Sequence, residues 1–246
     1  MSSAVTLPLA VVGAILNIFL FVSPWKTVKK VQEQYGKEVS ASPLSPINAQ
    51  FTQHQDSFST FPFFCMTINC LFWVSYAFLI EDYVILICNG IGLFLSFYYH
   101  FEIHKVIDNK RNYFYKLAAS FSVYLLGMIV SFLFNPETEV AASRLGFICA
   151  TAAILMIGSP LSSIKYVIEK KNAESIPLLL AVAATANSLN WTLYGLVLSN
   201  PNIYVPNGVG TVLGSIQLGL KYMYRSGSPQ VFSLSGNSPN KLILPA

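Results

Sequence analysis

Seven long apolar segments dominate this sequence, each close to the roughly 20 residues that a helix needs to cross the hydrocarbon core of a bilayer. Only 11% of the 246 residues are charged and the mean hydropathy is +0.54, whereas an ordinary soluble domain has about 25% charged residues. The segments are expected at 7–23, 59–80, 83–103, 115–134, 145–164, 177–198 and 202–222. The sequence therefore predicts an all-α membrane protein with seven transmembrane helices.

The basic residues predict the orientation of these helices. All of the 15 Lys and Arg residues except Arg144 lie at or beyond the end of the first, third, fifth or seventh segment. Because cytosolic loops are enriched in Lys and Arg, we expect the N-terminus outside and the C-terminus in the cytosol. The net charge of +4 is then explained by membrane orientation, and we expect no nucleic-acid partner.

One pattern of residues occurs twice, at a constant separation of 118 residues. The string N-x-x-x-W-x-x-Y begins at Asn69 and again at Asn187, and Asn-Gly-x-Gly starts 13 residues after each tyrosine. A Ser-Pro pair also ends the first helix of each unit, at Pro24 and Pro160, with an offset of 136 because the loops differ in length. A constant offset across two helices and their loop is typical of an internal duplication.

The duplicated unit contains three helices, and the fourth segment lies between the two copies. Because one extra span reverses the chain, both copies should cross the membrane in the same direction and share a site on an axis along the membrane normal. We expect a first three-helix bundle at 1–103, a linker helix with its flanks at 104–138, a second bundle at 139–225 and a cytosolic tail at 226–246. A polar stretch from about 32 to 56 is predicted to be disordered.

Two tryptophans and two asparagines of the repeat are predicted to lie at one depth. With a rise of 1.5 Å per residue, Trp73, Asn89, Trp191 and Asn207 are each about 12 Å from the turn that follows the second or sixth segment. An indole face can stack on the C–H face of a sugar ring, and a carboxamide both donates and accepts hydrogen bonds. This combination predicts a binding site for a neutral, hydroxyl-rich molecule.

Further polar residues allow two interpretations. Asn69 and Asn187 lie one helical turn from each tryptophan, where they either line the same cavity or bond to a neighbouring helix. His100 and His104 have the i, i+4 spacing of a metal site but lack obvious further ligands, so no metal is predicted. No Asp or Glu lies well inside a segment and no ATP-binding motif is present, so we expect passive transport with no cofactor and no enzymatic activity.

With these residues in view, the sequence resembles the eukaryotic SWEET sugar transporters, in which two three-helix bundles are joined by a linker helix. The first unit matches through Phe61-Pro62, Asn69-Cys70-Leu71, Tyr76 and Asn89-Gly90. The second unit matches more closely, through Gly158-Ser159-Pro160-Leu161, Glu174-Ser175-Ile176-Pro177, Trp191-Thr192-Leu193-Tyr194-Gly195 and Pro206-Asn207-Gly208.

The resemblance implies a role for each matching residue. Asn89 and Asn207 would bind the sugar between the stacking walls Trp73 and Trp191. The other pocket residues would be Asn69, Asn187, Leu20 and Met156. Asn69 and Asn187 would occupy the positions that set selectivity. The hinges of the bundles would be Pro24, Pro62, Pro160 and Pro177. The gates would be Tyr76 and Tyr194.

The same resemblance implies a passive, bidirectional uniporter that works by alternating access. Sucrose carriers tend to have serine where this chain has Asn69 and Asn187, so the larger side chains favour a monosaccharide such as glucose. A homo-oligomer is expected from the family, and the plasma membrane is the favoured location, with an endomembrane as the alternative.

Two other functions compete with this one. A PQ-loop carrier of amino acids would need Pro-Gln at the ends of the first and fifth helices, where this chain has Pro24-Trp25 and Pro160-Leu161. A seven-helix receptor would share the predicted topology, but receptor signalling gives no reason for a 118-residue duplication.

Overall fold

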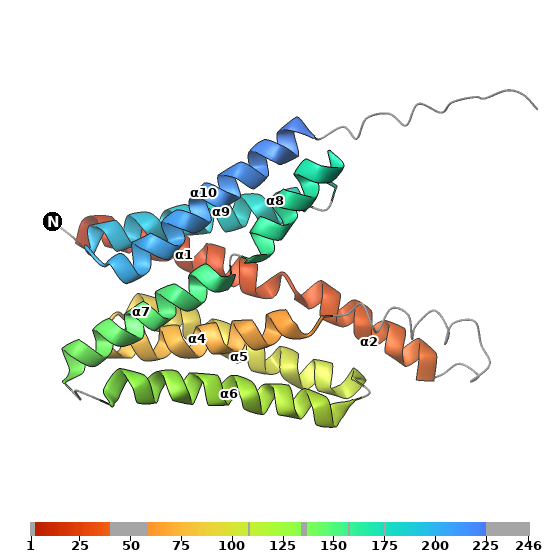
Figure 1. Cartoon of the computed structure of the whole chain (residues 1–246), viewed down its shortest axis with the longest axis horizontal. Coiled ribbons are helices and arrows are strands. Elements are labelled where there is room, and N and C mark those ends of the chain that lie inside the picture. Colours follow the sequence, from red (N-terminus) through yellow and green to blue (C-terminus); the bar gives the residue numbers. More distant parts are fainter. Residues whose placement is uncertain are drawn as a thin grey trace, which may run out of the picture.

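The computed structural model describes residues 3–39, 59–107, 109–133, 137–156, 158–174 and 176–224. Those residues form helices and connecting turns, with no strand among them (Figure 1). The helices are α1 (Ser3–Val22), α2 (Trp25–Val39), α4 (Phe61–Leu79), α5 (Tyr83–Val106), α6 (Lys110–Phe132), α7 (Thr138–Met156), α8 (Gly158–Lys170), α9 (Leu178–Val197) and α10 (Pro201–Met223).

The fifth predicted segment consists of two helices. The sequence predicts one helix at 145–164, whereas α7 begins at Thr138 and α8 begins at Gly158. The early start places Glu139 in the first turn of α7, where a carboxylate stabilises the helix dipole. Pro160 lies in the first turn of α8, the place in a helix where a missing backbone N–H costs least. The first unit has an equivalent break, because α1 and α2 meet at Ser23-Pro24, although the predicted segment 7–23 covers α1 alone.

The predicted disorder of the polar stretch is wrong over 32–39, which forms the last turns of α2. This helix has an apolar face that packs on α5: Val28 is buried, and the Trp25 ring stacks on Tyr98 with centroids 5.1 Å apart. The Gln32 amide donates a hydrogen bond to Glu102 of α5. Glu102 is buried and also forms an ion pair of 2.8 Å with Lys105. Residues 40–56 lie outside the described part of the chain.

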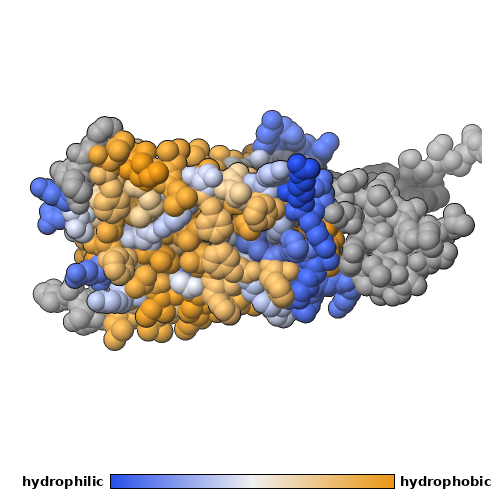
Figure 2. All heavy atoms as spheres, turned by 90° about the horizontal axis from the view of Figure 1, so that it is seen from below, coloured by the Kyte–Doolittle hydropathy of each residue, from blue (hydrophilic) through white to orange (hydrophobic). Residues whose placement is uncertain are grey.

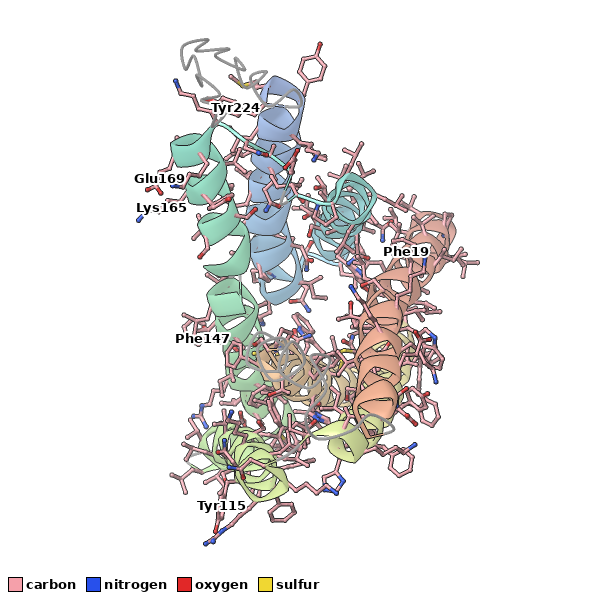
Figure 3. The ribbon with its side chains drawn as sticks, turned by 90° about the vertical axis from the view of Figure 1, so that its right-hand side faces the viewer. Phe19, Tyr115, Phe147, Lys165, Glu169 and Tyr224 are labelled. Carbon is pink, nitrogen blue, oxygen red and sulfur yellow. The ribbon has the colours of Figure 1, made fainter. Side chains whose placement is uncertain are left out.

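The surface has the pattern of a protein that spans a bilayer. Figure 2 shows a broad hydrophobic band with hydrophilic residues at its two ends. Figure 3 shows Phe19, Tyr115 and Phe147 pointing outward from the helices, and these side chains are 42 to 69% exposed. The described spans long and apolar enough to cross a membrane are Val5–Glu33, Phe61–Leu79, Tyr83–Val106, Lys110–Phe132 and Thr138–Leu155. Helices α9 and α10, with 20 and 23 residues, also have the length to cross a membrane, although they are not among these spans.

The two ends of the bundle differ in charge. We call the end near the α4–α5 and α9–α10 turns the tyrosine end, after Tyr76 and Tyr194, and the end that carries Pro24, Pro62 and Pro177 the proline end. Among the described residues, every Lys and Arg except Arg144 lies at the proline end. This distribution follows the one expected from the sequence.

The first helix of each unit packs against the second helix of the other unit. Helix α1 packs on α9 in the upper layer of Figure 1, and α7 packs on α4 in the lower layer. Each layer therefore contains helices of both units. Gly13 permits the close approach of α1, because a Cβ atom there would lie 2.6 Å from Nδ2 of Asn190 and 3.1 Å from the Trp191 ring. The Asn190 amide instead donates to the backbone oxygen of Leu9 at 2.9 Å, which joins the two helices.

The turns at the tyrosine end are also duplicated. Glu81 and Ser199, which are 118 residues apart, both have a left-handed backbone with φ of 56° and 52°. Each precedes the residue that caps the next helix: Asp82 accepts hydrogen bonds from the backbone of α5, and Asn200 accepts one from the backbone of α10. The repeat therefore extends from the sequence to the backbone geometry of the turns.

Candidate functional site

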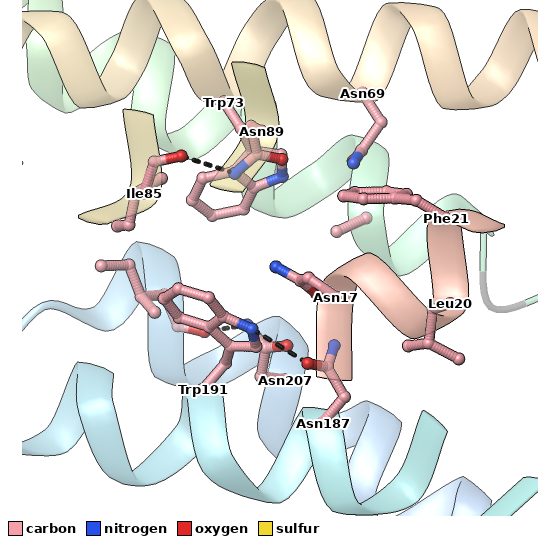
Figure 4. Close-up of a pocket in the computed structure, with 12 residues that line it drawn as sticks. Asn17, Leu20, Phe21, Asn69, Trp73, Ile85, Asn89, Asn187, Trp191 and Asn207 are labelled. Carbon is pink, nitrogen blue, oxygen red and sulfur yellow. Dashed lines mark hydrogen bonds between the residues drawn. The ribbon is translucent and has the colours of Figure 1, made fainter. Parts of the chain in front are cut away.

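A cavity of about 250 Å³ lies between the two bundles, and the repeated asparagines and tryptophans line it. Its walls come from α1, α4, α5, α7, α9 and α10 (Figure 4). The lining residues are Asn17, Leu20, Phe21, Asn69, Trp73, Ile85, Asn89, Ala153, Asn187, Trp191, Ile203 and Asn207.

Two indole rings form facing walls of this cavity. Trp73 on α4 and Trp191 on α9 lie on opposite sides in Figure 4. Each ring is held edge-on by the tyrosine one turn further along its helix, with centroids 5.8 Å apart for Trp73 and Tyr76 and 5.3 Å apart for Trp191 and Tyr194. Both indoles are more than nine-tenths buried, so their orientation is fixed by packing.

Asn89 and Asn207 have the same conformation in the two units. Nδ2 of Asn89 donates to the carbonyl oxygen of Ile85 at 3.0 Å, and Nδ2 of Asn207 donates to that of Ile203 at 2.8 Å. These bonds within a single helix fix the carboxamides and leave Oδ1 of each as an acceptor at the cavity (Figure 4). They also leave one N–H of each amide for a ligand.

Asn69 and Asn187 line the same cavity, which was one of the two interpretations that the sequence left open. Asn187 accepts a hydrogen bond of 3.2 Å from Nε1 of Trp191 in its own helix. Asn69 makes no hydrogen bond to any other residue that the structure describes. Neither asparagine bonds to a neighbouring helix within that part of the chain.

Leu20 and Met156 are the remaining predicted pocket residues. Leu20 is part of the lining. The side chain of Met156 lies outside the described part of the structure, although Ala153, one turn earlier on α7, lines the cavity.

Sequence reasoning missed five lining residues: Asn17, Phe21, Ile85, Ala153 and Ile203. Asn17 had a signal, since it is a polar residue in an apolar segment and shares a helix face with Leu20. Ile85 and Ile203 had a weaker one, because they are 118 residues apart and one turn before the paired asparagines. Phe21 and Ala153 are apolar residues in apolar helices, and nothing in the pattern distinguishes them.

Among the described residues, no ionisable side chain belongs to the lining. The cavity offers two flat aromatic faces and several carboxamide donors and acceptors, with apolar contacts from Leu20, Phe21, Ile85 and Ile203. This chemistry suits a molecule that has many hydroxyl groups, an apolar ring face and no charge.

The tyrosine end of the cavity is closed by hydrogen bonds that cross between the bundles. The Tyr194 hydroxyl donates to Oδ2 of Asp82 at 2.9 Å, and Nδ2 of Asn200 donates to the Tyr76 hydroxyl at 2.8 Å. These pairs are equivalent, because 118 residues separate Tyr76 from Tyr194 and Asp82 from Asn200. Each tyrosine therefore contacts the cap of the third helix of the opposite unit.

The predicted hinge prolines gather at the proline end. Pro24 lies between α1 and α2, Pro62 in the first turn of α4, and Pro177 at the N-terminal cap of α9. Pro160 lies in α8, and its side chain is outside the described part. All four positions are helix ends or breaks, where a change of backbone angle disrupts the fewest hydrogen bonds.

His100 joins three helices and has no metal-site neighbours. Its Nε2 lies 2.8 Å from Oγ1 of Thr67 on α4, and its Nδ1 lies 2.6 Å from the Tyr113 hydroxyl on α6. His104 is exposed, and the described residues contain no group of three or more His, Cys, Asp or Glu that could hold a metal ion. The histidine ties the linker helix to the first bundle.

Comparison with known proteins places this architecture in a family. The family profile described as "Sugar efflux transporter for intercellular exchange" matches residues 40–111 and again residues 143–228, once in each unit. A solved structure of a eukaryotic SWEET transporter has the same fold, with a TM-score of 0.74 and 24% identity over 89% of this chain and 96% of that one.

Relatives come from distant eukaryotes. Sugar transporter SWEET1 of Rattus norvegicus is 31% identical over 71% of this chain and 79% of its own length. Sugar transporter SWEET1 of Dictyostelium discoideum is 28% identical over 85% of this chain and 89% of its own. Bidirectional sugar transporter SWEET16 of Arabidopsis thaliana is 27% identical over 95% and 96%. This chain belongs to the SWEET family of sugar transporters, a multi-pass integral membrane family with the three-one-three arrangement of helices and no enzymatic activity.

Proposed function

We propose that this protein is a passive, bidirectional uniporter of monosaccharides such as glucose that works by alternating access. The observation that carries the proposal is the neutral cavity between the bundles, where Trp73 faces Trp191 and each unit contributes the same pair of asparagines. Stacking holds the apolar face of a sugar ring, and the carboxamides exchange hydrogen bonds with its hydroxyl groups.

The side chains of the cavity support one sugar ring rather than two. The indoles of Trp73 and Trp191 face each other and offer one stacking position between them. Asn69 and Asn187 narrow the cavity, and serine at both positions would widen it.

The absence of ionisable groups from the lining supports uncoupled transport. Proton-coupled carriers use Asp, Glu or His inside the membrane as relays, and none of these residues lines the cavity within the described part of the chain. The amino-acid alternative has no support for the same reason, since a zwitterion would be desolvated without an opposite charge to pair with.

The geometry of the two ends supports alternating access. The cross-bundle hydrogen bonds of Tyr194 and Tyr76 close the tyrosine end, and the helix breaks at Pro24 and Pro160 lie toward the opposite end. With the N-terminus outside, the tyrosine end is extracellular and this conformation is closed to the outside. Opening it requires the hydrogen bonds of both tyrosines to break while the proline end closes.

Location and assembly complete the proposal. We expect the plasma membrane and a homo-oligomer, and neither is needed to build the cavity, which lies within one chain. The N-terminus outside and the C-terminus in the cytosol follow from the placement of the basic residues.

Purified protein in liposomes tests this function. We expect saturable uptake of radiolabelled glucose, accelerated exchange when unlabelled glucose is trapped inside, and no response to a protonophore. Sucrose and neutral amino acids should compete weakly. Strong sucrose flux without glucose flux would overturn the choice of monosaccharide, and flux that collapses with the proton gradient would overturn the passive mechanism.

A further inference from the structure

The lining of the cavity is nearly two-fold symmetric in its chemistry. Residues of the second and third helices of each unit occur in pairs that are 118 residues apart, and the two members of every such pair are the same amino acid. The pairs are Asn69 with Asn187, Trp73 with Trp191, Ile85 with Ile203, and Asn89 with Asn207.

The first helices break this symmetry. The offset of 136 that relates Pro24 to Pro160 also relates Asn17 on α1 to Ala153 on α7, and both residues line the cavity. One unit therefore presents a carboxamide where the other presents a methyl group. This is the clearest chemical difference between the two halves of the described lining.

Asn17 is positioned by the contact between α1 and α9. One turn before it, Gly13 lies so close to Asn190 and Trp191 that a side chain would not fit. Because residues i and i+4 share a helix face, the face of α1 that contacts Trp191 carries Asn17 to the edge of the cavity. Figure 4 shows its amide between the two indole walls.

Asn17 does not act as a bond between helices. An asparagine inside a membrane helix commonly bonds to a neighbouring helix, as Asn190 does to Leu9. Within the described structure, Asn17 makes no such hydrogen bond, although it is half-buried and lines the cavity. Its donors and its acceptor are free to bind a ligand.

A monosaccharide has no two-fold axis, so a symmetric pocket would hold it equally well in two orientations. We propose that Asn17 is a specificity-determining residue that binds one hydroxyl group of the sugar and so selects one of these orientations. The inference rests on the proposed transport of a monosaccharide. The opposite wall, with Ala153, cannot make the equivalent hydrogen bond.

The effect should have the size of one hydrogen bond. Losing a neutral hydrogen bond of about 0.5 to 1.5 kcal/mol changes affinity by roughly two- to twelvefold. Removing the matching hydroxyl from the sugar should cost about as much on the native protein. Removing both partners should cost little more than removing either one, because the interaction can be lost only once.

A set of monodeoxy glucose analogues tests this coupling. Each analogue competes with labelled glucose for exchange by the native protein and by the Asn17→Ala variant in liposomes. We expect one analogue to bind the native protein roughly two- to twelvefold more weakly than glucose does, and this difference to disappear in Asn17→Ala. Ile15→Ala, which removes an exposed side chain from the same helix, should keep the native profile.

A double variant moves the carboxamide to the other half of the cavity. In Asn17→Ala with Ala153→Asn, the pocket becomes approximately the two-fold image of the native one. The sugar should then bind in the opposite orientation. The affinity should again depend on the same deoxy position as in the native protein. Asn17→Ala alone still decides the proposal if this double variant does not fold.

The outcomes separate this inference from the proposed function. If the native protein moves no monosaccharide, the proposed function fails. If the native protein transports glucose and Asn17→Ala keeps every analogue ratio unchanged, the role of Asn17 fails alone. A uniform loss of affinity for all analogues also contradicts it, because a structural defect would not be confined to one hydroxyl group.

Discussion

The Tyr194 hydroxyl donates a hydrogen bond of 2.9 Å to the Asp82 carboxylate, across the boundary between the two bundles. The equivalent contact in the other direction joins the Tyr76 hydroxyl to the Asn200 side chain, 2.8 Å from Nδ2 and 3.1 Å from Oδ1, and to Nδ2 of Asn202 at 3.4 Å. Hydrogen bonds to charged groups contribute about 1.5 to 3 kcal/mol, whereas neutral ones contribute about 0.5 to 1.5 kcal/mol. One half of this closure therefore has a single bond to a carboxylate, and the other half has several neutral contacts.

Both halves of the closure predict an effect of the corresponding Tyr→Phe variant. Tyr194→Phe removes one bond to a carboxylate and Tyr76→Phe removes several neutral contacts, so each variant should open the tyrosine end roughly tenfold more often than the native protein does. The measurement is the labelling rate of a cysteine at Ile203 by a membrane-impermeant thiol reagent, in a background without the native cysteines. A native labelling rate in either variant would mean that its tyrosine does not hold this end closed.

The paired asparagines provide the second prediction. Asn89→Ala and Asn207→Ala should each abolish most glucose transport while leaving expression and thermal stability close to native, because their only described bonds lie within a single helix. Asn112→Ala, at an exposed position on α6, is the matched control and should transport normally. A double variant at Asn89 and Asn207 with full activity would remove both residues from the pocket.

Helix packing provides the third prediction. Gly195→Ala should lower stability by about 1 to 3 kcal/mol, because the added Cβ would lie 2.7 Å from the backbone nitrogen of Tyr204, which cannot rotate away. Gly219→Ala should be neutral or slightly stabilising, since nothing lies within 4 Å of its Cβ position and alanine favours a helix. Thermal unfolding in detergent compares them, and equal midpoints would contradict the close approach of α9 and α10.

The histidine tie to the linker helix provides the fourth prediction. His100 lies between two hydroxyl groups, with Nε2 2.8 Å from Oγ1 of Thr67 and Nδ1 2.6 Å from the Tyr113 hydroxyl. His100→Leu should cost about 1 to 3 kcal/mol of stability, because it leaves the buried Tyr113 hydroxyl without its partner.

A double variant checks this explanation. Adding Tyr113→Phe to His100→Leu removes the orphaned hydroxyl and should recover part of the loss. Leucine is the residue that the second unit has at the equivalent position, Leu218. Simple additivity of the two substitutions in thermal unfolding would show that the hydrogen bond contributes nothing.

The sequence was sufficient to predict the features that depend on periodicity. The spans could be located because repeated apolar runs of helical length are typical of membrane helices and rare in soluble domains. Trp73, Asn89, Trp191 and Asn207 could be located because they recur at one offset. The fourth segment was predicted to begin at 115, whereas α6 begins at Lys110. Its polar first turn is stabilised by the Asn109 side chain, which accepts a hydrogen bond from the backbone N–H of Asn112.

Features that depend on contact between the units could not be read from one sequence. Nothing in the repeat indicates that Tyr194 would meet Asp82, because the partners lie 112 residues apart and only the packed bundles bring them together. Asn17 is different, because the single offset of 136 that relates the two Ser-Pro pairs also relates Asn17 to Ala153. This pairing can be read from the sequence once the offset is applied along the whole first helix.

The two carboxylate oxygens of Asp82 accept hydrogen bonds from different parts of the protein. Oδ1 accepts from the backbone of Val84 and Ile85 and so begins α5, while Oδ2 accepts from Tyr194. The acceptor is thus held in place by the helix itself, whether or not the tyrosine is bound. Each time the bundles come back together, Tyr194 meets a partner that has kept its orientation, so reclosure needs no conformational search by the carboxylate.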